Sequence, residues 1–163
     1  MTASNFERLI RLADATFAVR NDPSQLNVNE EIMARLRKIH PRTISEYSDE
    51  NGPVAWVLLI PTTLRLMHRF LKEEISEKEL FNLTPENAEY DALYLCSALV
   101  LEEYRRKGIV RNLVMEAISE IRKDHPLQAL FVWPFTREGE LTAEAIARSA
   151  SLPLYKRSVK KNH

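Results

Sequence analysis

Apolar residues recur every three or four positions in six stretches of this 163-residue chain, which predicts six helices. The first covers about residues 5–19 after the capping-box pattern Ser4 to Glu7, and the second follows Asn29 and ends at His40-Pro41. The remaining four begin after Thr62 or Thr63, at Ser76, after Gly108, and at Leu141 or Thr142.

Between these stretches lie runs that are typical of strands. Residues 43–47 and 53–60 flank Asn51-Gly52, a common signal for a hairpin turn. Further strands are expected over residues 92–101, 128–133 and 152–159, and the loop 134–139 precedes the last helix. The order α-α-β-β-α-α-β-α-β-α-β predicts a single domain over residues 1–163, of the α/β (α+β) class, with a mixed sheet flanked by helices.

Composition narrows the function classes. Lys and Arg number 23 and Asp and Glu number 23, so the chain lacks the basic excess of a general nucleic-acid binder, and we expect no nucleic-acid partner. No apolar run is long enough for a membrane span, and no Cys/His spacing indicates a metal site. The single Cys96 fits a reducing compartment, which makes a cytoplasmic location the expectation. The basic end from Lys156 to Lys161 is interpreted as solvated.

One of only three glycines, Gly108, lies in a basic turn between an apolar strand and a helix. A glycine here indicates a special backbone angle or a close approach by a ligand. The first amides of a helix have no internal partner and carry positive potential, so this turn predicts an anion site. Arg105, Arg106, Lys107 and Arg111 add positive charge around it.

The segment Val100 to Arg111 resembles the signature of the GCN5-related N-acetyltransferase (GNAT) family, with Val100, Tyr104, Arg105, Gly108 and Arg111 in register. The resemblance implies a mostly antiparallel mixed sheet, acetyl-CoA as cofactor and direct acetyl transfer to a primary amine. It implies a cofactor site made of Leu99, Val100, Arg105, Arg106, Lys107, Gly108, Ile109, Val110 and Arg111. The sequence departs from the signature at Glu102, Arg106 and Val110.

Catalytic residues are less evident than the cofactor loop. Some family members carry a carboxylate where this chain has Tyr94, and a tyrosine is a poor base at neutral pH, so Tyr94 is interpreted as a wall residue or hydrogen-bond donor. Glu89 and Asp91 remain candidates for a base acting through water. Many members place a tyrosine acid at the position of Ser149, so the leaving thiolate would be protonated here by Ser149, by solvent, or not by this domain. No metal ligand is expected.

Residues 62–90 form a helical insertion before the motif strand, and we hypothesise that Met67, Phe70 and Phe81 shape a lid or an oligomer interface. Their spacing fits ordinary core packing equally well. The expected partners are a small-molecule amine or a peptide acceptor, with a second copy of the chain as a further candidate. The alternative function is a non-catalytic acyl-CoA-binding or regulatory domain, because the usual acid and base positions are not retained.

Overall fold

The computed structural model describes residues 4–20 and 29–158, and it confirms the predicted order of helices and strands. One short 3-10 helix, η1, precedes the helix that follows the basic turn. The elements are α1 (Asn5–Arg20), α2 (Glu30–Ile39), β1 (Ile44–Asp49), β2 (Gly52–Thr62), α3 (Leu64–Leu71), α4 (Glu77–Leu83), β3 (Ala92–Val100), η1 (Glu102–Tyr104), α5 (Ile109–Asp124), β4 (Ala129–Val132), α6 (Arg137–Ala150) and β5 (Leu154–Lys156).

The five strands form one mixed sheet in the order β1-β2-β3-β4-β5. β1 with β2 and β2 with β3 are antiparallel, whereas β3 with β4 and β4 with β5 are parallel. The expected mixed sheet flanked by helices is therefore confirmed, with antiparallel and parallel pairs in equal number. The parallel pairs follow from α5 and α6, because each helix returns the chain to the end of the sheet where the preceding strand began.

Local capping sets most helix boundaries. The side chains of Asn29, Thr63 and Ser76 accept hydrogen bonds from the first turns of α2, α3 and α4, as the sequence predicted. The predicted start of α6 at Leu141 or Thr142 is wrong. The helix begins at Arg137, because Thr136 caps it by accepting the Gly139 N–H at 3.0 Å. β5 is also shorter than predicted, and Val159 lies outside the described residues.

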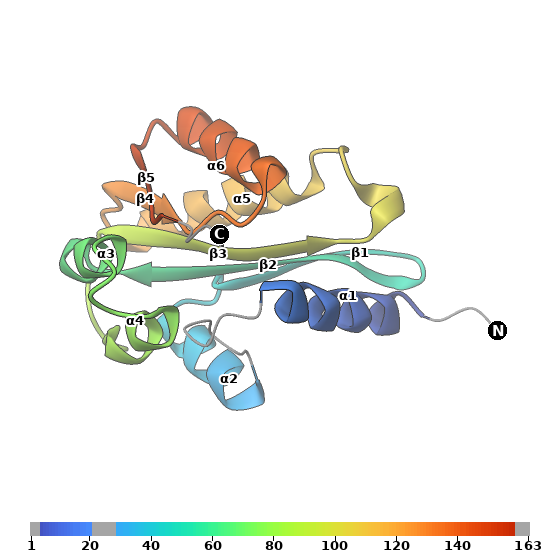
Figure 1. Cartoon of the computed structure of the whole chain (residues 1–163), viewed down its shortest axis with the longest axis horizontal. Coiled ribbons are helices and arrows are strands. Elements are labelled where there is room, and N and C mark those ends of the chain that lie inside the picture. Colours follow the sequence, from blue (N-terminus) through green and yellow to red (C-terminus); the bar gives the residue numbers. More distant parts are fainter. Residues whose placement is uncertain (1–3, 21–28, 159–163) are drawn as a thin grey trace, which may run out of the picture.

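Two clusters of buried side chains fill the space on either side of the sheet. One joins α2, α3 and α4 to alternate residues of β2, β3 and β4, and the other joins α5 and α6 to the intervening ones. In Figure 1, α5 and α6 lie above the sheet and α2 and α4 lie below it. The basic turn lies at one end of the sheet beside the β1–β2 turn, and α3 lies at the opposite end.

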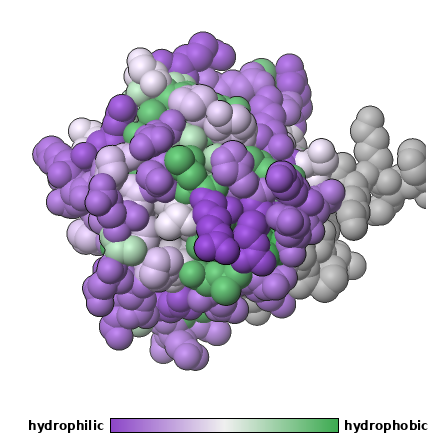
Figure 2. Space-filling model, turned by 90° about the vertical axis from the view of Figure 1, so that its left-hand side faces the viewer, coloured by the Kyte–Doolittle hydropathy of each residue, from purple (hydrophilic) through white to green (hydrophobic). Residues whose placement is uncertain are grey.

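The insertion α3–α4 belongs to the core. Met67, Phe70 and Phe81 are at most 1% exposed, so the hypothesis that these three side chains form an oligomer interface is wrong, and core packing is confirmed. The apolar residues of α3 face inward because they occupy one side of the helix, while Arg65 and His68 are exposed. Seen from the α3 end, the surface is mainly hydrophilic with small scattered apolar patches (Figure 2).

Candidate functional site

β3 separates from β4 about half-way along its length. The parallel pairing runs from Ala92 opposite Ala129 to Leu95 opposite Val132, but β3 continues to Val100 alongside β2. Leu58 pairs with Ser97 and Leu59 with Leu95, so Cys96 is an extra residue, a β-bulge. A bulge bends its strand. From Ser97 onward, the edge of β3 that faces away from β2 has no strand partner within residues 4–20 and 29–158.

The open edge leads into the basic turn. Arg106 and Gly108 both have left-handed backbone conformations, with φ of 63° and 75°. The special backbone angle expected at Gly108 is therefore present. Gly108 is the N-cap residue of α5 and has no side chain to cap the helix. The first amides of α5 therefore have no side-chain acceptor from the N-cap residue. A Cβ at Gly108 would meet no atom of the described chain within 4 Å, and this open space lies directly over the helix N-terminus.

Two polar contacts anchor η1 to distant parts of the chain. The Tyr104 hydroxyl donates a short hydrogen bond to Asp49 at the end of β1, and Asp49 also accepts from the Asn5 side chain at 2.9 Å. The Arg8 guanidinium binds both oxygens of Glu103 at 2.6 Å. The hydrogen bond from Tyr104 lowers the pKa of Asp49, and the bond from Arg8 lowers the pKa of Glu103 to about 2. The turn is thus held against both α1 and the hairpin.

The cations of the turn are exposed and point toward solvent. Arg105, Arg106, Lys107 and Arg111 have no carboxylate within 4.0 Å in the described part of the chain. Lys107 Nζ lies 5.4 Å from the centre of the Tyr104 ring, and Arg111 donates to Ser149 Oγ at 2.8 Å. A strand edge, a left-handed turn, a free helix N-terminus and unpaired cations therefore occupy one contiguous region, whose chemistry suits an extended molecule with phosphate groups.

The apolar members of the predicted cofactor site have a second role in packing. Leu99, Val100, Ile109 and Val110 are partly buried against the cluster beneath α5. Val110, which departs from the small residue of the family signature, packs against this cluster. The backbone amides of Ile109 and Val110 at the helix start remain the groups that can meet an anion.

The candidate catalytic residues do not gather in one place. Glu89 is exposed, and Asp91 caps α3 by accepting the Leu64 N–H at 2.7 Å. Asp91 lies five residues before Cys96, about 16 Å away at ~3.3 Å per strand residue. Both carboxylates therefore lie at the end of β3 where β4 is still paired, away from the open edge. Ser149 lies at the end of α6, bound to Arg111.

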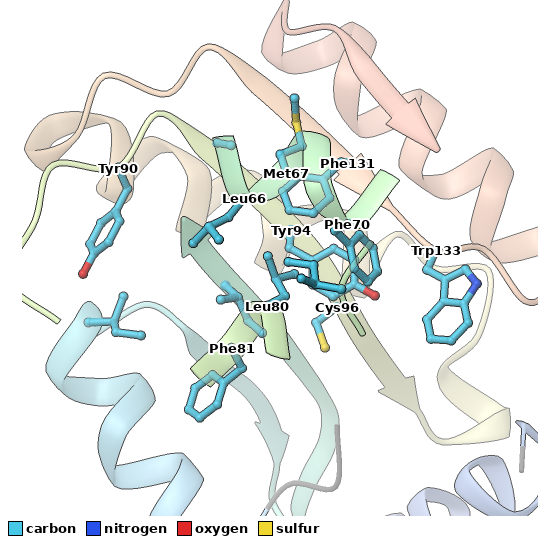
Figure 3. Close-up of a cluster of buried hydrophobic side chains, with 14 of the residues drawn as sticks. Leu66, Met67, Phe70, Leu80, Phe81, Tyr90, Tyr94, Cys96, Phe131 and Trp133 are labelled. Atoms are coloured by element: carbon cyan, nitrogen blue, oxygen red, sulfur yellow. The ribbon is translucent and has the colours of Figure 1, made fainter. Parts of the chain in front are cut away.

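Tyr94 lies inside the cluster on the α3–α4 side of the sheet. Its ring stacks on Phe131 with ring centres 5.0 Å apart and meets Phe70 edge-on at 5.0 Å (Figure 3). Its hydroxyl donates to Glu77 Oε2 at 2.5 Å, so Tyr94 is a hydrogen-bond donor, as the sequence indicated.

Glu77 is a residue that the sequence interpretation missed. The charge-rich run Lys72 to Glu79 is typical of a solvated face, but the Glu77 side chain is only 2% exposed. Its Oε2 also lies 3.9 Å from Cys96 Sγ. The sequence indicates the burial of Glu77 only through its position. Glu77 is the first residue of α4 and lies four residues before the buried Phe81, on the same face of the helix.

The expectation of a solvated basic end is wrong for Arg157, whereas Lys156 is exposed as expected. Lys156 pairs with Glu144 at 2.6 Å, and Arg157 is only 7% exposed. The Arg157 guanidinium lies over the rings of Phe70 and Trp133, at 4.5 and 4.7 Å. Its Nη1 donates to the Ile75 carbonyl at 2.7 Å. Trp133 and Arg157 directly follow β4 and β5, so the ends of these parallel strands place them together beside the open edge of β3.

Neither a metal site nor a membrane span is found in the part of the chain that the structure describes. Among residues 4–20 and 29–158, no group of three or more His, Cys, Asp or Glu side chains is arranged to hold a metal ion. No helix in these ranges is long and apolar enough to cross a membrane.

Comparison with known proteins gives one similar structure. The chain is similar to the crystal structure of Chaetomium thermophilum Naa20 in complex with a bisubstrate analogue, with 15% identity and a TM-score of 0.46. The match covers 83% of this chain and 62% of that one, so this chain spans less than two thirds of that protein's length. No family model and no curated protein match the chain.

Proposed function

We propose that this chain binds acetyl-CoA and transfers its acetyl group to a primary amine. The observation that carries the proposal is the continuity of the open β3 edge with the left-handed turn and the N-terminus of α5. The amides of residues 105–111 are suited to a pyrophosphate, and the backbone of β3 near Leu99 and Val100 is suited to pairing with an extended amide-bearing arm. When bound, acetyl-CoA supplies the acetyl group as an activated thioester.

The residues present fit this cofactor. The open space over Gly108 gives phosphate oxygens access to the helix amides, and Arg106 and Lys107 offer exposed cations beside it. Val100 and Cys96 are four residues apart, about 13 Å at ~3.3 Å per residue, which is comparable to an extended pantetheine arm. Its reactive end would thus reach the bulge, beside the Glu77–Tyr94 pair.

A non-catalytic acyl-CoA-binding or regulatory domain is the second candidate. The observation that favours it is the burial of Tyr94, at 1% exposed, and the engagement of Ser149 by Arg111, because neither group is free to exchange a proton with a ligand in this arrangement.

Calorimetry and a thiol-release assay separate these functions. Binding of acetyl-CoA followed by amine-dependent thiol release supports the enzyme, and binding without release supports the binding domain. Gly108→Val is expected to weaken CoA binding at least about tenfold, roughly 1.4 kcal/mol, because it fills the space over the helix amides. Ser119→Val, on the exposed surface of the same helix, is the control. Equal affinity in wild type and Gly108→Val would place the cofactor elsewhere.

A further inference from the structure

The outer edge of β5 is a free edge of the sheet. β5 is the last strand in the order β1-β2-β3-β4-β5, and its outer edge has no strand partner within residues 4–20 and 29–158. The Pro153 carbonyl accepts from β4 and the Arg157 N–H donates to β4, each at 2.9 Å. Backbone groups alternate sides along a strand, so the N–H and C=O groups of Leu154 and Lys156 point away from β4. This edge therefore offers donors and acceptors to a further strand.

The side chain of Lys156 leaves this edge open. A lysine on an edge strand can keep other strands away, because pairing would desolvate its charge. Here Lys156 Nζ binds Glu144 at 2.6 Å and Glu140 at 3.3 Å. Both carboxylates belong to α6, so the Lys156 side chain lies against that helix and its charge is compensated there. On the opposite face of β5, Tyr155 is 44% exposed.

A cleft of about 410 Å³ lies between β5 and α6. Its lining comes from the end of α6, the loop that follows and β5, and consists of Glu144, Ala147, Arg148, Ser151, Leu152, Leu154 and Lys156. Arg148 is exposed and has no carboxylate within 4.0 Å in the described part of the chain. Glu144 lies about one helical turn before it. The cleft thus combines an apolar lining with a negative and a positive group on the same helix.

The backbone of β5 is self-complementary in an antiparallel pair. When a two-fold axis passes beside Tyr155, Leu154 of each copy lies opposite Lys156 of the partner subunit. The outward N–H and C=O groups of each copy then meet those of the other. The two Tyr155 side chains lie opposite each other, and aromatic cross-strand pairs of this kind stabilise a sheet.

The same axis brings opposite charges of α6 together. Lys156 binds Glu144, and Leu154 lines the cleft beside Arg148, so Tyr155 lies level with the turn between Glu144 and Arg148. A two-fold axis at this level places the two α6 helices antiparallel. Glu144 of each copy then faces Arg148 of the partner subunit, and the unpaired guanidinium gains a carboxylate.

We propose that two copies of this chain associate through the outer edges of β5, with the two α6 helices side by side across the two-fold axis. The sheet then continues from one copy into the other. A second copy is the partner because the charges at Glu144 and Arg148 complement themselves under this symmetry. The interface uses none of the residues of the basic turn, so it is independent of the proposed function.

Charge reversal tests the contact between the two α6 helices. Sedimentation equilibrium measures the dimer dissociation constant of wild type, Glu144→Arg, Arg148→Glu and an equal mixture of the two variants. Each variant alone places like charges across the axis, so its dimer should be at least about tenfold weaker. In the mixture the facing charges are opposite again, and a mixed dimer should form at least as tightly as wild type. Glu138→Arg, exposed on the same helix and outside the cleft, should behave as wild type.

A cysteine at the two-fold axis tests the register of the strands. Tyr155→Cys places two thiols opposite each other in a non-hydrogen-bonded pair, whose Cα atoms lie about 4.5 Å apart. This spacing suits a disulfide. Mild oxidation should link the Tyr155→Cys dimer at least about tenfold faster than Pro153→Cys, an exposed control that lies off the axis. Cys96 is buried in both variants.

Several results would overturn the proposal. Wild type that stays monomeric up to about 1 mM would leave the β5 edge without a second copy as its partner. Equal dissociation constants in wild type and the charge variants, or equal oxidation rates of the two cysteine variants, would place the interface elsewhere. If Glu144→Arg does not fold, Arg148→Glu decides, because Arg148 forms no ion pair within residues 4–20 and 29–158. Failure of CoA to bind an intact dimer would count against the proposed function alone.

Discussion

Replacing Gly108 by alanine isolates the energetic role of the left-handed turn. At φ of 75°, a residue with a Cβ is disfavoured by about 1–2 kcal/mol. The added Cβ meets nothing within 4 Å, so no steric term within the chain adds to this cost. Alanine also restricts the unfolded chain, which offsets about 0.4–1 kcal/mol. The net loss of unfolding free energy for Gly108→Ala is therefore about 1 kcal/mol.

Thermal unfolding followed by circular dichroism measures this effect. For a chain of this length, 1 kcal/mol corresponds to a decrease in Tm of roughly 2–4 °C. Gly108→Asn is the matched variant, and it should lose less than alanine, because asparagine tolerates the left-handed region. If Gly108→Ala has the same Tm as wild type, or if the asparagine and alanine variants lower Tm equally, the positive φ is not the reason for glycine at this position.

Three further predictions concern the anchors of the site. The pairing with Arg8 lowers the pKa of Glu103 from 4.5 to about 2. This pairing therefore stabilises the fold at pH values above 4.5, and the stabilisation is lost as the pH falls through about 2. Glu103→Gln should flatten the pH dependence of Tm in that window, and an unchanged slope would argue against the pair. Tyr104→Phe removes the donor to Asp49 and should weaken CoA binding several-fold in calorimetry, with the sheet intact by circular dichroism; equal affinity would show that the turn needs no such anchor. Arg157→Ala removes a buried cation from two aromatic rings and should lower the unfolding free energy by about 2 kcal/mol in urea titration, whereas a loss below about 0.5 kcal/mol would indicate an exposed side chain.

The sequence was sufficient for elements that depend on local chemistry. Asn29, Thr63 and Ser76 each cap the helix that follows them, and Gly52 and Gly108 take the positive φ values that their turns require. The start of α6 could not be placed, since Gly139 is usually a sign of a loop. In the structure, the cap at Thr136 and the acidic first turn of the helix outweigh this preference.

The polar residues of the site were harder to predict, because their burial depends on distant partners. Glu77 and Arg157 lie in charge-rich stretches whose composition is typical of solvent-exposed segments. Only the packing of α3 and α4 over the sheet buries Glu77 beside Tyr94, and only the end of β5 brings Arg157 onto Phe70. Neither contact has a signature in the local pattern of apolar residues.

The anchoring of η1 has a consequence for the order of folding. Arg8 and Glu103 are 95 positions apart, and Tyr104 and Asp49 are 55 apart. Contacts between positions so distant close large loops and form slowly compared with helices and hairpins. We therefore expect the sheet to form before the turn takes its final shape. A ligand that binds this turn would select chains that have completed folding, and its binding rate during refolding would report the last step of assembly.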